Sequence, residues 1–331
     1  MKQGLAHIPI LPSLFSFLDI MALPNLPTRL FDCQSVLFKN ELIICGGNMN
    51  DKCYSYHLEK REYKWICDYP KGTVLRGHTV ISIKNDNETT TLLSFGGGGT
   101  MKTPYHTFVM YYRSVWTDES NQNKWIPFPG NILLGKKQGY NLFGARAAIG
   151  GSKRSLLFIV HPPQKMEVLD VNSLTPTCRQ KMFVPSCSDE FNCLVGYNPT
   201  TFILMAKSSN IMVRLDEERN MLFYKQLPTN PFLDSCWGSA CVLFNHFIIT
   251  FGGCGPAQKF IDSVFLFNIK LQCWYQLDVR MPFPIVQSVA VLHSSSHRFS
   301  VHIIGGRNTQ NEALPLHWML SQVFLLLFII F

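Results

Sequence analysis

A pattern of four short β-prone segments recurs along this chain. In its clearest copy, between Leu42 and Trp65, an apolar run leads into Gly46-Gly47, and two further segments carry Tyr54 and Trp65. A unit that repeats at a spacing of about 50 residues indicates an array of similar supersecondary units, each of which buries its apolar faces against the next. Although 331 residues could supply two ordinary domains, the repeat predicts one large all-β domain.

Six copies of the pattern can be identified by the apolar run that ends the second segment. The run meets a glycine pair in four copies, at Gly46-Gly47, Gly96-Gly97, Gly252-Gly253 and Gly305-Gly306. Two degenerate copies, around Leu156–Val160 and Phe202–Ala206, have no glycine pair. The 259 residues from Gly47 to Gly306 make five intervals of about 52 residues, so the spacing is regular across all six copies.

Each copy divides into four segments separated by Gly, Pro, Asn or Asp, as in a meandering antiparallel sheet. First segments are expected near Val36, Val80, Ala147, Leu194, Val242 and Val289, third segments near Tyr54, Val109, Val168, Val213 and Phe265, and fourth segments near Trp65, Trp125, Met182, Phe223 and Trp274. The sixth copy lacks its third and fourth segments. The N-terminal segment Phe15–Leu23 is similar to the fourth segments, and we expect it to pair with the last blade and close the ring.

The residues that carry the pattern resemble the kelch family, within the superfamily of galactose-oxidase-like propellers: an apolar run, Gly-Gly, a strand with Tyr, then a strand with Trp. The resemblance covers nearly all of residues 15 to 306 and is most specific in the first, second and fifth copies. It implies a β-propeller of about six four-stranded blades. The glycines would permit positive φ and close backbone approach, and the aromatic side chains would fill the wedge between blades. An ordinary β-sandwich is the alternative, and the regular spacing argues against it.

The sequence divides into an N-terminal extension (1–14), the propeller (15–306) and a C-terminal tail (307–331). From Leu314 to Phe331 the tail is almost wholly apolar. As a helix, these residues would span about 27 Å, just enough for a bilayer. No basic cluster flanks them, however, and the nine residues Val323–Phe331 could instead supply the missing third strand of the last blade. A membrane anchor and a buried strand both stay open.

Composition excludes several classes of protein. Hydrophobic residues make up 47% of the chain and charged residues 16%, which is incompatible with a disordered protein. The net charge of +8 is scattered in pairs such as Lys136-Lys137, so no basic patch favours nucleic acid. The eleven cysteines form no C-x-x-C pair that could hold zinc, and several, such as Cys45 and Cys241, lie in apolar runs. With no convincing signal peptide, a reducing, cytoplasmic location is expected.

No motif predicts a catalytic, cofactor or metal site. Gly130–Lys137 has the spacing of a P-loop, but Lys137 stands where magnesium binding needs Ser or Thr. His293 and His297 have the i, i+4 spacing of ligands on a helix, but the serines between them indicate a loop. The Tyr and His set that the resemblance to copper oxidases would require cannot be located.

The sequence therefore predicts a non-enzymatic protein-binding module or scaffold, because kelch relatives mostly bind proteins and loops on a rigid propeller commonly carry recognition. The protein partner cannot be identified from these residues. The candidate contacts are charged or aromatic residues in the turns after second segments and before first segments: Lys52, Arg76, Lys102, Tyr105, Lys259 and Arg307. The alternatives are a propeller enzyme of the copper-oxidase type and a propeller scaffold tethered to a membrane by the tail.

Overall fold

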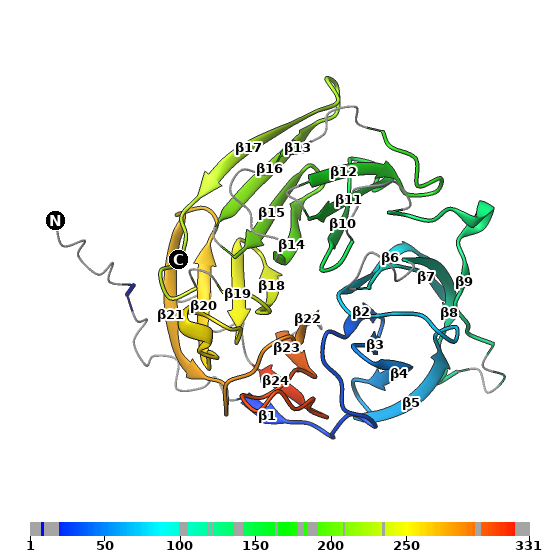
Figure 1. The fold of residues 1–331 in the computed structure, drawn as a ribbon, viewed down its shortest axis with the longest axis horizontal. Helices are drawn as coiled ribbons and strands as arrows, with labels where there is room; N and C mark the ends of the chain where they lie inside the picture. The colour runs from blue at the N-terminus through cyan, green and yellow to red at the C-terminus, as the bar shows by residue number, and fades with distance from the viewer. Residues whose placement is uncertain are drawn as a thin grey trace.

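Short apolar segments separated by turn residues form twenty-four β-strands in the described part of the chain. The computed structural model describes residues 8–9, 20–98, 105–117, 120, 122–135, 142–162, 165–177, 182–183, 191–207, 209–233, 236–294 and 299–321. The strands form six four-stranded antiparallel sheets, arranged around a central axis like the blades of a propeller (Figure 1). The predicted all-β propeller of six four-stranded blades is confirmed.

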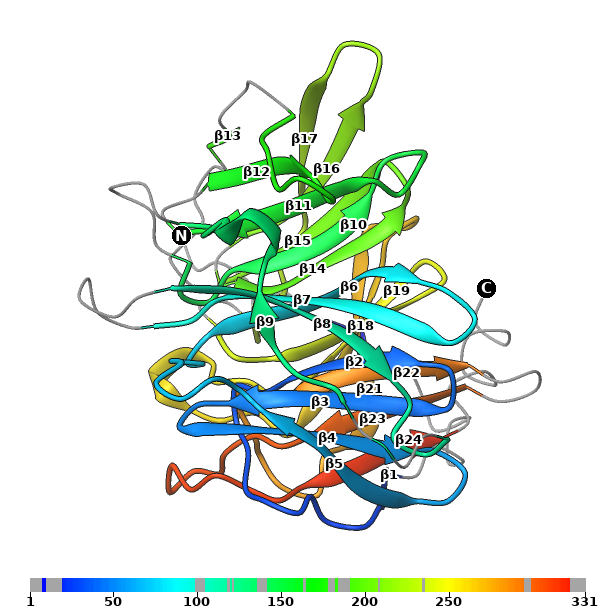
Figure 2. The same cartoon turned by 90° about the vertical axis from the view of Figure 1, so that its right-hand side faces the viewer.

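Five blades are built from four consecutive strands. Blade 1 contains β2 (Gln34–Phe38), β3 (Glu41–Gly47), β4 (Asn50–His57) and β5 (Glu62–Asp68), and blade 2 contains β6 (His78–Asn85), β7 (Thr89–Gly96), β8 (His106–Arg113) and β9 (Ile126–Pro127). Blade 3 contains β10 (Arg146–Gly150), β11 (Leu156–His161), β12 (Lys165–Asp170) and β13 (Met182–Phe183), and blade 4 contains β14 (Phe191–Asn198), β15 (Thr201–Ala206), β16 (Asn210–Asp216) and β17 (Met221–Leu227). Blade 5 contains β18 (Ala240–Phe244), β19 (Phe247–Phe251), β20 (Ser263–Asn268) and β21 (Cys273–Arg280). Short 3-10 turns, η1 (Pro129–Asn131) and η2 (Pro256–Gln258), lie in two connections. The first strands lie nearest the axis and the fourth strands at the rim (Figure 1). Figure 2 shows the same ring from the side of blades 1 and 2.

The sixth blade joins the two ends of the chain. Its strands β22 (Val289–Ser294), β23 (Phe299–Ile304) and β24 (His317–Ser321) are completed by the N-terminal strand β1 (Ile20–Ala22). Strand β1 pairs antiparallel with β24, and beyond it the backbone N–H of Leu23 donates to the carbonyl of His317 at 2.9 Å. The predicted closure of the ring by an N-terminal strand is confirmed.

The third strand of blade 6 comes from the C-terminal tail, but not from the part that the hydrophobic pattern favours. That pattern points to Val323–Phe331, which lies outside the described residues, whereas the strand is His317–Ser321. His317 breaks the apolar run of the sequence, yet it is buried, because polar partners surround its ring. The propeller therefore continues beyond residue 306. No helix of the described residues is long and apolar enough to span a membrane.

The repeat positions found in the sequence fall within strands in every blade, with one shift: Trp125 immediately precedes β9. The aromatic side chains do not all fill the wedge between blades as expected. Trp125 and Trp274 are buried, but Trp65 and Tyr111 are more than half exposed. Trp65 lies on the rim strand β5, where its indole N–H donates to Asp68 Oδ1 at 2.8 Å instead of packing against a neighbouring blade.

The hydrophobic core is divided among the junctions between blades. One cluster of buried residues lies at each of the six junctions, including the junction of blades 6 and 1. The second strands are the most deeply covered, since β3, β15 and β19 are buried at every position. A strand that is apolar throughout requires cover on both faces of its sheet, and each blade obtains this cover from its two neighbours.

A chain of polar side chains crosses the junction between blades 6 and 1. His302 Nδ1 lies 2.9 Å from His317 Nε2, and His317 Nδ1 lies 2.6 Å from the hydroxyl of Tyr63. The ring of Tyr56 packs edge-on against His317, with centroids 4.5 Å apart. Burial lowers the pKa of His302 to about 4 and that of His317 to about 2, so both imidazoles are neutral in the folded protein near pH 7.

The glycine pairs mark where second strands leave the crowded sheet. Seven of the eight repeat glycines have φ between 52° and 109°, and Gly47 is the exception. A Cβ added to Gly97 would overlap the carbonyl oxygen of Val74, in the segment that leads into β6. Gly252 is equally confined by the carbonyl of Ile285, ahead of β22. These glycines are required both by backbone conformation and by close approach of another backbone segment.

We predict that Gly97→Ala strongly destabilises the propeller, whereas Gly72→Ala does not. Both glycines have positive φ, 75° and 87°, so each alanine costs about 1 kcal/mol of left-handed strain. A Cβ at Gly72 meets no atom within 4 Å, but at Gly97 it also meets backbone, which adds about 3 kcal/mol of overpacking. Urea denaturation of both variants measures the difference. Equal losses of unfolding free energy would contradict the assigned close approach.

We also predict that acid weakens the fold through its buried histidines. The folded pKa values of His78, His106, His302 and His317 are lowered to between about 2 and about 4, chiefly by burial, while unfolded histidine titrates near 6.5. The stabilising contribution is complete above pH 6.5 and decreases as the pH falls toward the folded values, by about 1.4 kcal/mol per pH unit for each histidine.

Denaturation of wild type and His302→Gln at several pH values tests this. Between pH 6.5 and 4, the unfolding free energy of the variant should decrease less steeply than that of the wild type, by about 1.4 kcal/mol per pH unit. A stability profile parallel to that of the wild type would show that His302 does not resist protonation in the folded state.

Candidate functional site

The connections between blades place candidate contact residues on one face of the ring. In each antiparallel blade, the turn from the second to the third strand and the connection from the fourth strand to the next blade emerge at the same end of the sheet. In blade 1 the two are joined directly, because the N–H of Asn48 donates to the carbonyl of Phe31 at 2.9 Å. We call this end of the ring the loop face.

A left-handed residue precedes the first strand in five of the blades. These residues are Asp32, Gly77, Gly144, Gly238 and Gln287, with φ between 53° and 70°. They bond from blade to blade, since the N–H of Asp32 donates to Gln287, that of Gln287 to Gly238, and that of Gly144 to Gly77. Three blades thus have glycine at this position, and blades 1 and 6 have polar residues with side chains.

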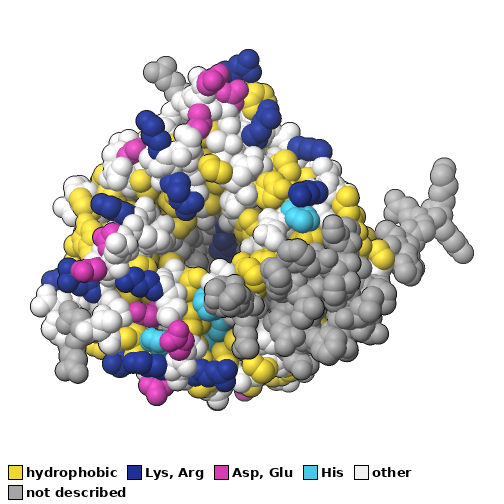
Figure 3. Space-filling view, turned by 180° about the vertical axis from the view of Figure 1, so that it is seen from behind, with side chains coloured by type: hydrophobic (Ala, Val, Ile, Leu, Met, Phe, Trp, Pro, Cys, Tyr) yellow, Lys and Arg dark blue, Asp and Glu magenta, His cyan; other side chains and the backbone are white. Residues whose placement is uncertain are grey.

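Three of these pre-strand residues, Asp32, Gly238 and Gln287, border a cavity of about 180 Å³ on the axis of the propeller, which we call the central cavity. Its walls are the beginnings of the innermost strands, and the lining includes Asp32, Gln34, Arg146, Gln287 and Ser288. Seen from behind, the middle of the molecule is hollow, with basic atoms in its depth (Figure 3).

Charge is concentrated at the central cavity. Arg146 opens β10 and donates through one guanidinium nitrogen to the carbonyls of Gly144 and Ala145, at 3.2 and 3.0 Å. Desolvation lowers the pKa of Arg146, and Asp32 is the largest influence that opposes this. Burial raises the pKa of Asp32, and the positive charges of Arg146, Arg307 and Arg76 oppose that rise. One carboxylate therefore lies within the field of three guanidinium groups.

Two of the sequence-predicted contacts, Arg76 and Arg307, are brought to this region. The guanidinium of Arg307 lies between two aromatic rings, 5.6 Å from the centroid of Phe31 and 5.5 Å from that of Trp237. Arg76 lies over the ring of Phe143 at 5.2 Å. Stacking on aromatic faces holds a guanidinium in a fixed position without neutralising its charge.

The other predicted contacts lie apart from the central cavity. Lys52 pairs with Asp68 at 3.3 Å on the surface of blade 1, and Lys259 follows the η2 turn in blade 5. Tyr105 borders a second cavity, of about 370 Å³, over blade 2. Lys102 lies outside the described residues. The predicted set is therefore not one continuous site.

The second cavity contains a buried histidine. His106 lines it, and its Nε2 lies 2.7 Å from the hydroxyl of Ser94, which also accepts a hydrogen bond from Tyr69 at 3.0 Å. Burial lowers the pKa of His106 to about 3. The remaining lining mixes prolines and aliphatic side chains with the polar residues Thr73, Thr107 and Asn131. The titratable side chains that line this cavity are His106, Lys71 and Tyr105, and no carboxylate is among the lining residues.

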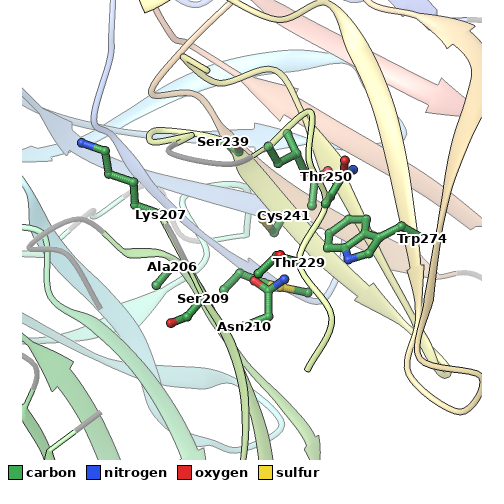
Figure 4. Close-up of a pocket in the computed structure, with 12 residues that line it drawn as sticks. Ala206, Lys207, Ser209, Asn210, Thr229, Ser239, Cys241, Thr250 and Trp274 are labelled. Carbon is green, nitrogen blue, oxygen red and sulfur yellow. The ribbon is translucent and has the colours of Figure 1, made fainter. Parts of the chain in front are cut away.

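A third pocket lies between blades 4 and 5 (Figure 4). Asn210, Thr250 and Trp274 line it, and both the Asn210 amide and the Trp274 indole donate to the carbonyl of Pro228 at 3.0 Å. Its volume of about 20 Å³ corresponds to roughly one water molecule. The pocket is therefore part of the packing between blades and is too small for a ligand.

Sequence reasoning did not identify Asp32, Arg146 or Gln287. The signal was present in the segments R-G-H-T, F-G-A-R and W-G-S-A, in which a glycine follows Arg76, Phe143 or Trp237 just before a first strand. Aligning all six copies on that glycine, rather than on the glycine pair, would have shown that Asp32 and Gln287 replace it. The described residues contain no group of three or more His, Cys, Asp or Glu side chains that could hold a metal.

Comparisons with known proteins support the fold. No family model matches the chain, and no curated protein matches it in sequence. Among solved structures, the chain is similar to YjhT, with a TM-score of 0.66 over 91% of this chain and 97% of that one. The two sequences are 12% identical, so the likeness extends to the propeller architecture, and function must be argued from the site itself.

Proposed function

We propose that this chain is a divergent kelch-type propeller that acts as a non-enzymatic protein-binding module, with the loop face as its contact surface. One observation carries the proposal: the connections on this face, which also contain Arg76 and Arg307, expose large apolar side chains. Met49 is 98% exposed, Phe232 52%, Phe283 40% and Leu133 36%.

These side chains contribute little to the stability of the fold, because apolar surface stabilises a protein only where it is removed from water. The aromatic ones are nevertheless held in place. Phe232 stacks on Phe265 with centroids 6.1 Å apart, and Phe283 lies edge-on to Trp318 at 4.8 Å. Preorganised aromatic and arginine side chains are typical anchors of protein interfaces, since little conformational entropy is lost when a partner covers them.

The repeat supports the kelch part of the proposal. Glycine pairs end the second segments in blades 1, 2, 5 and 6, and a Tyr and then a Trp follow in blades 1 and 2, as in the kelch pattern. In blade 5, Phe265 takes the place of the tyrosine and Trp274 follows. The absence of the pair in blades 3 and 4 makes the chain a divergent member of such a group.

The proposal predicts that partner capture depends on Phe232 and Phe283. Full-length chain would be immobilised as wild type, as Phe232→Ser/Phe283→Ser, and as the control Phe223→Ser/Leu271→Ser. The control residues are similarly exposed, at 38% and 55%, but lie on a rim strand and on a hairpin turn away from the loop face. Wild type and control should capture the same proteins, and the loop-face variant should capture at least tenfold less of each. The loss of two anchors costs well over 1.4 kcal/mol of binding free energy.

Quantitative mass spectrometry of the bound proteins gives the comparison, and circular dichroism establishes that the three proteins are equally folded. Equal capture by all three would exclude Phe232 and Phe283 as contacts. Loss in the control alone would move the contact surface to the rim.

A further inference from the structure

Three residues that line the central cavity carry buried polar atoms that the protein itself does not satisfy. Three oxygen atoms are buried and make no hydrogen bond: Asp32 Oδ2, Gln287 Oε1 and Ser288 Oγ. Arg307 Nε, on the loop face, is also buried without a hydrogen bond. The side chain of Gln287 hydrogen-bonds to the Asp32 carboxylate, which leaves one acceptor oxygen free on each residue. Buried polar atoms nearly always have partners, so a group of orphaned acceptors in one cavity indicates a site built for a ligand.

Two of these residues also hold an unfavourable backbone conformation. Asp32 and Gln287 have φ of 53° and 59° at a position where Gly77, Gly144 and Gly238 stand in other blades. Most other non-glycine residues with positive φ, such as Gln272, lie in turns between paired strands, where this conformation reverses the chain. At the pre-strand position glycine would suffice for the fold. Residues that retain strain beside a cavity are the ones expected to be kept for binding.

The charges define the ligand. Arg146 lines the cavity together with Asp32, and the guanidinium groups of Arg307 and Arg76 also act on Asp32, so the region has an excess of positive charge and favours an anion. Guanidinium groups suit carboxylates in particular, because their N–H donors match the two oxygens. The ionised carboxylate of Asp32 and the amide oxygen of Gln287 only accept hydrogen bonds, so the same ligand must also carry N–H or O–H donors.

The size of the cavity limits the ligand further. Its volume of about 180 Å³ equals that of about six water molecules and lies below the roughly 300 to 1,000 Å³ of sites for larger organic ligands. A molecule of a few carbon atoms, or one side chain, fits this space.

We propose that the central cavity binds a small carboxylic acid that carries a hydrogen-bond donor, as amino acids and hydroxy acids do. The carboxylate is held at Arg146, and the donor is held by Asp32 Oδ2 and Gln287 Oε1. This site does not depend on the protein-binding function proposed above, because none of Phe232, Phe283 and Met49 lines the cavity.

Calorimetric titration of the full chain with L-glutamate and with glutarate tests the proposal. The two acids have the same length and the same two carboxylates, but only glutamate carries the ammonium donor. Glutamate should bind about tenfold more tightly, the effect of one or two hydrogen bonds to acceptors that are otherwise unpaired. A third titration, with glutamate blocked as an N-acetyl amide, separates the two sources of this chemistry: tighter binding of the blocked form identifies an acidic peptide residue, and tighter binding of the free form a small metabolite.

Two variants distinguish a binding role from a structural one. Gln287→Gly restores the residue of the other blades and should weaken glutamate binding about tenfold without lowering the melting temperature. Its control, Gln272→Gly, makes the same substitution at a φ of 55° in the hairpin between β20 and β21, away from the cavity, and should bind as wild type does. Asp32→Asn should remove the preference for glutamate over glutarate, because the acceptor charge is lost.

The proposal is overturned if the wild type binds none of the three probes up to about 10 mM, a concentration at which even contacts of about 3 kcal/mol would be measurable. It is equally overturned if glutamate binds Gln287→Gly and Asp32→Asn as it binds wild type. Failure of partner capture by the loop-face variant has no bearing on these titrations, so the two proposals stand or fall separately.

Discussion

Every blade of this protein is a sheet that is apolar on both faces, and the rest of the structure depends on this constraint. Strands such as β3 and β19 are buried along their whole length. A blade with water against one of its two faces would therefore leave about half of its apolar surface unburied. Each blade needs two neighbours, and only a closed ring gives two to all six. The six separate clusters at the six junctions are the result. Stability is therefore distributed around the ring, because the buried apolar residues of the described part of the chain form six clusters and not one central core.

Closure concentrates the demands of the fold at the blade that contains both ends of the chain. Strand β1 contributes only three paired residues, and the junction of blades 6 and 1 includes His302, His317 and Tyr63 in a hydrogen-bonded chain. Directional bonds there add specificity that apolar contacts lack, because the imidazole tautomers and the phenol are satisfied in one register of β24 against its neighbours. Because His302 and His317 are also buried in their neutral form, protonation of these two imidazoles destabilises the junction that closes the ring.

The sequence was sufficient to predict the number of blades, the strands and the closing N-terminal segment, because these depend on apolar periodicity and on glycine pairs that recur. It was insufficient for the third strand of blade 6. There the longest apolar run, Val323–Phe331, outweighed His317–Ser321, whose histidine is acceptable only because a histidine and a tyrosine from other strands meet it. Partners distant in sequence cannot be inferred from one segment. The expectation that Trp65 packs between blades was wrong for a similar reason. A repeat position determines where the residue lies in the blade, but not whether its side chain is buried.

The candidate site was missed because it consists of departures from the repeat rather than of a motif. Gly77, Gly144 and Gly238 show what the fold needs ahead of a first strand, and Asp32 and Gln287 are visible as exceptions only after the structure has aligned the blades. In a repeat protein the consensus residues are explained by the shared architecture, so a residue that departs from it at a measurable cost needs a separate explanation. Blades 1 and 6 are adjacent in the ring although their pre-strand residues are 255 positions apart in sequence. Ring closure is thus what brings the two exceptions, and with them the orphaned acceptors, to one side of a single cavity.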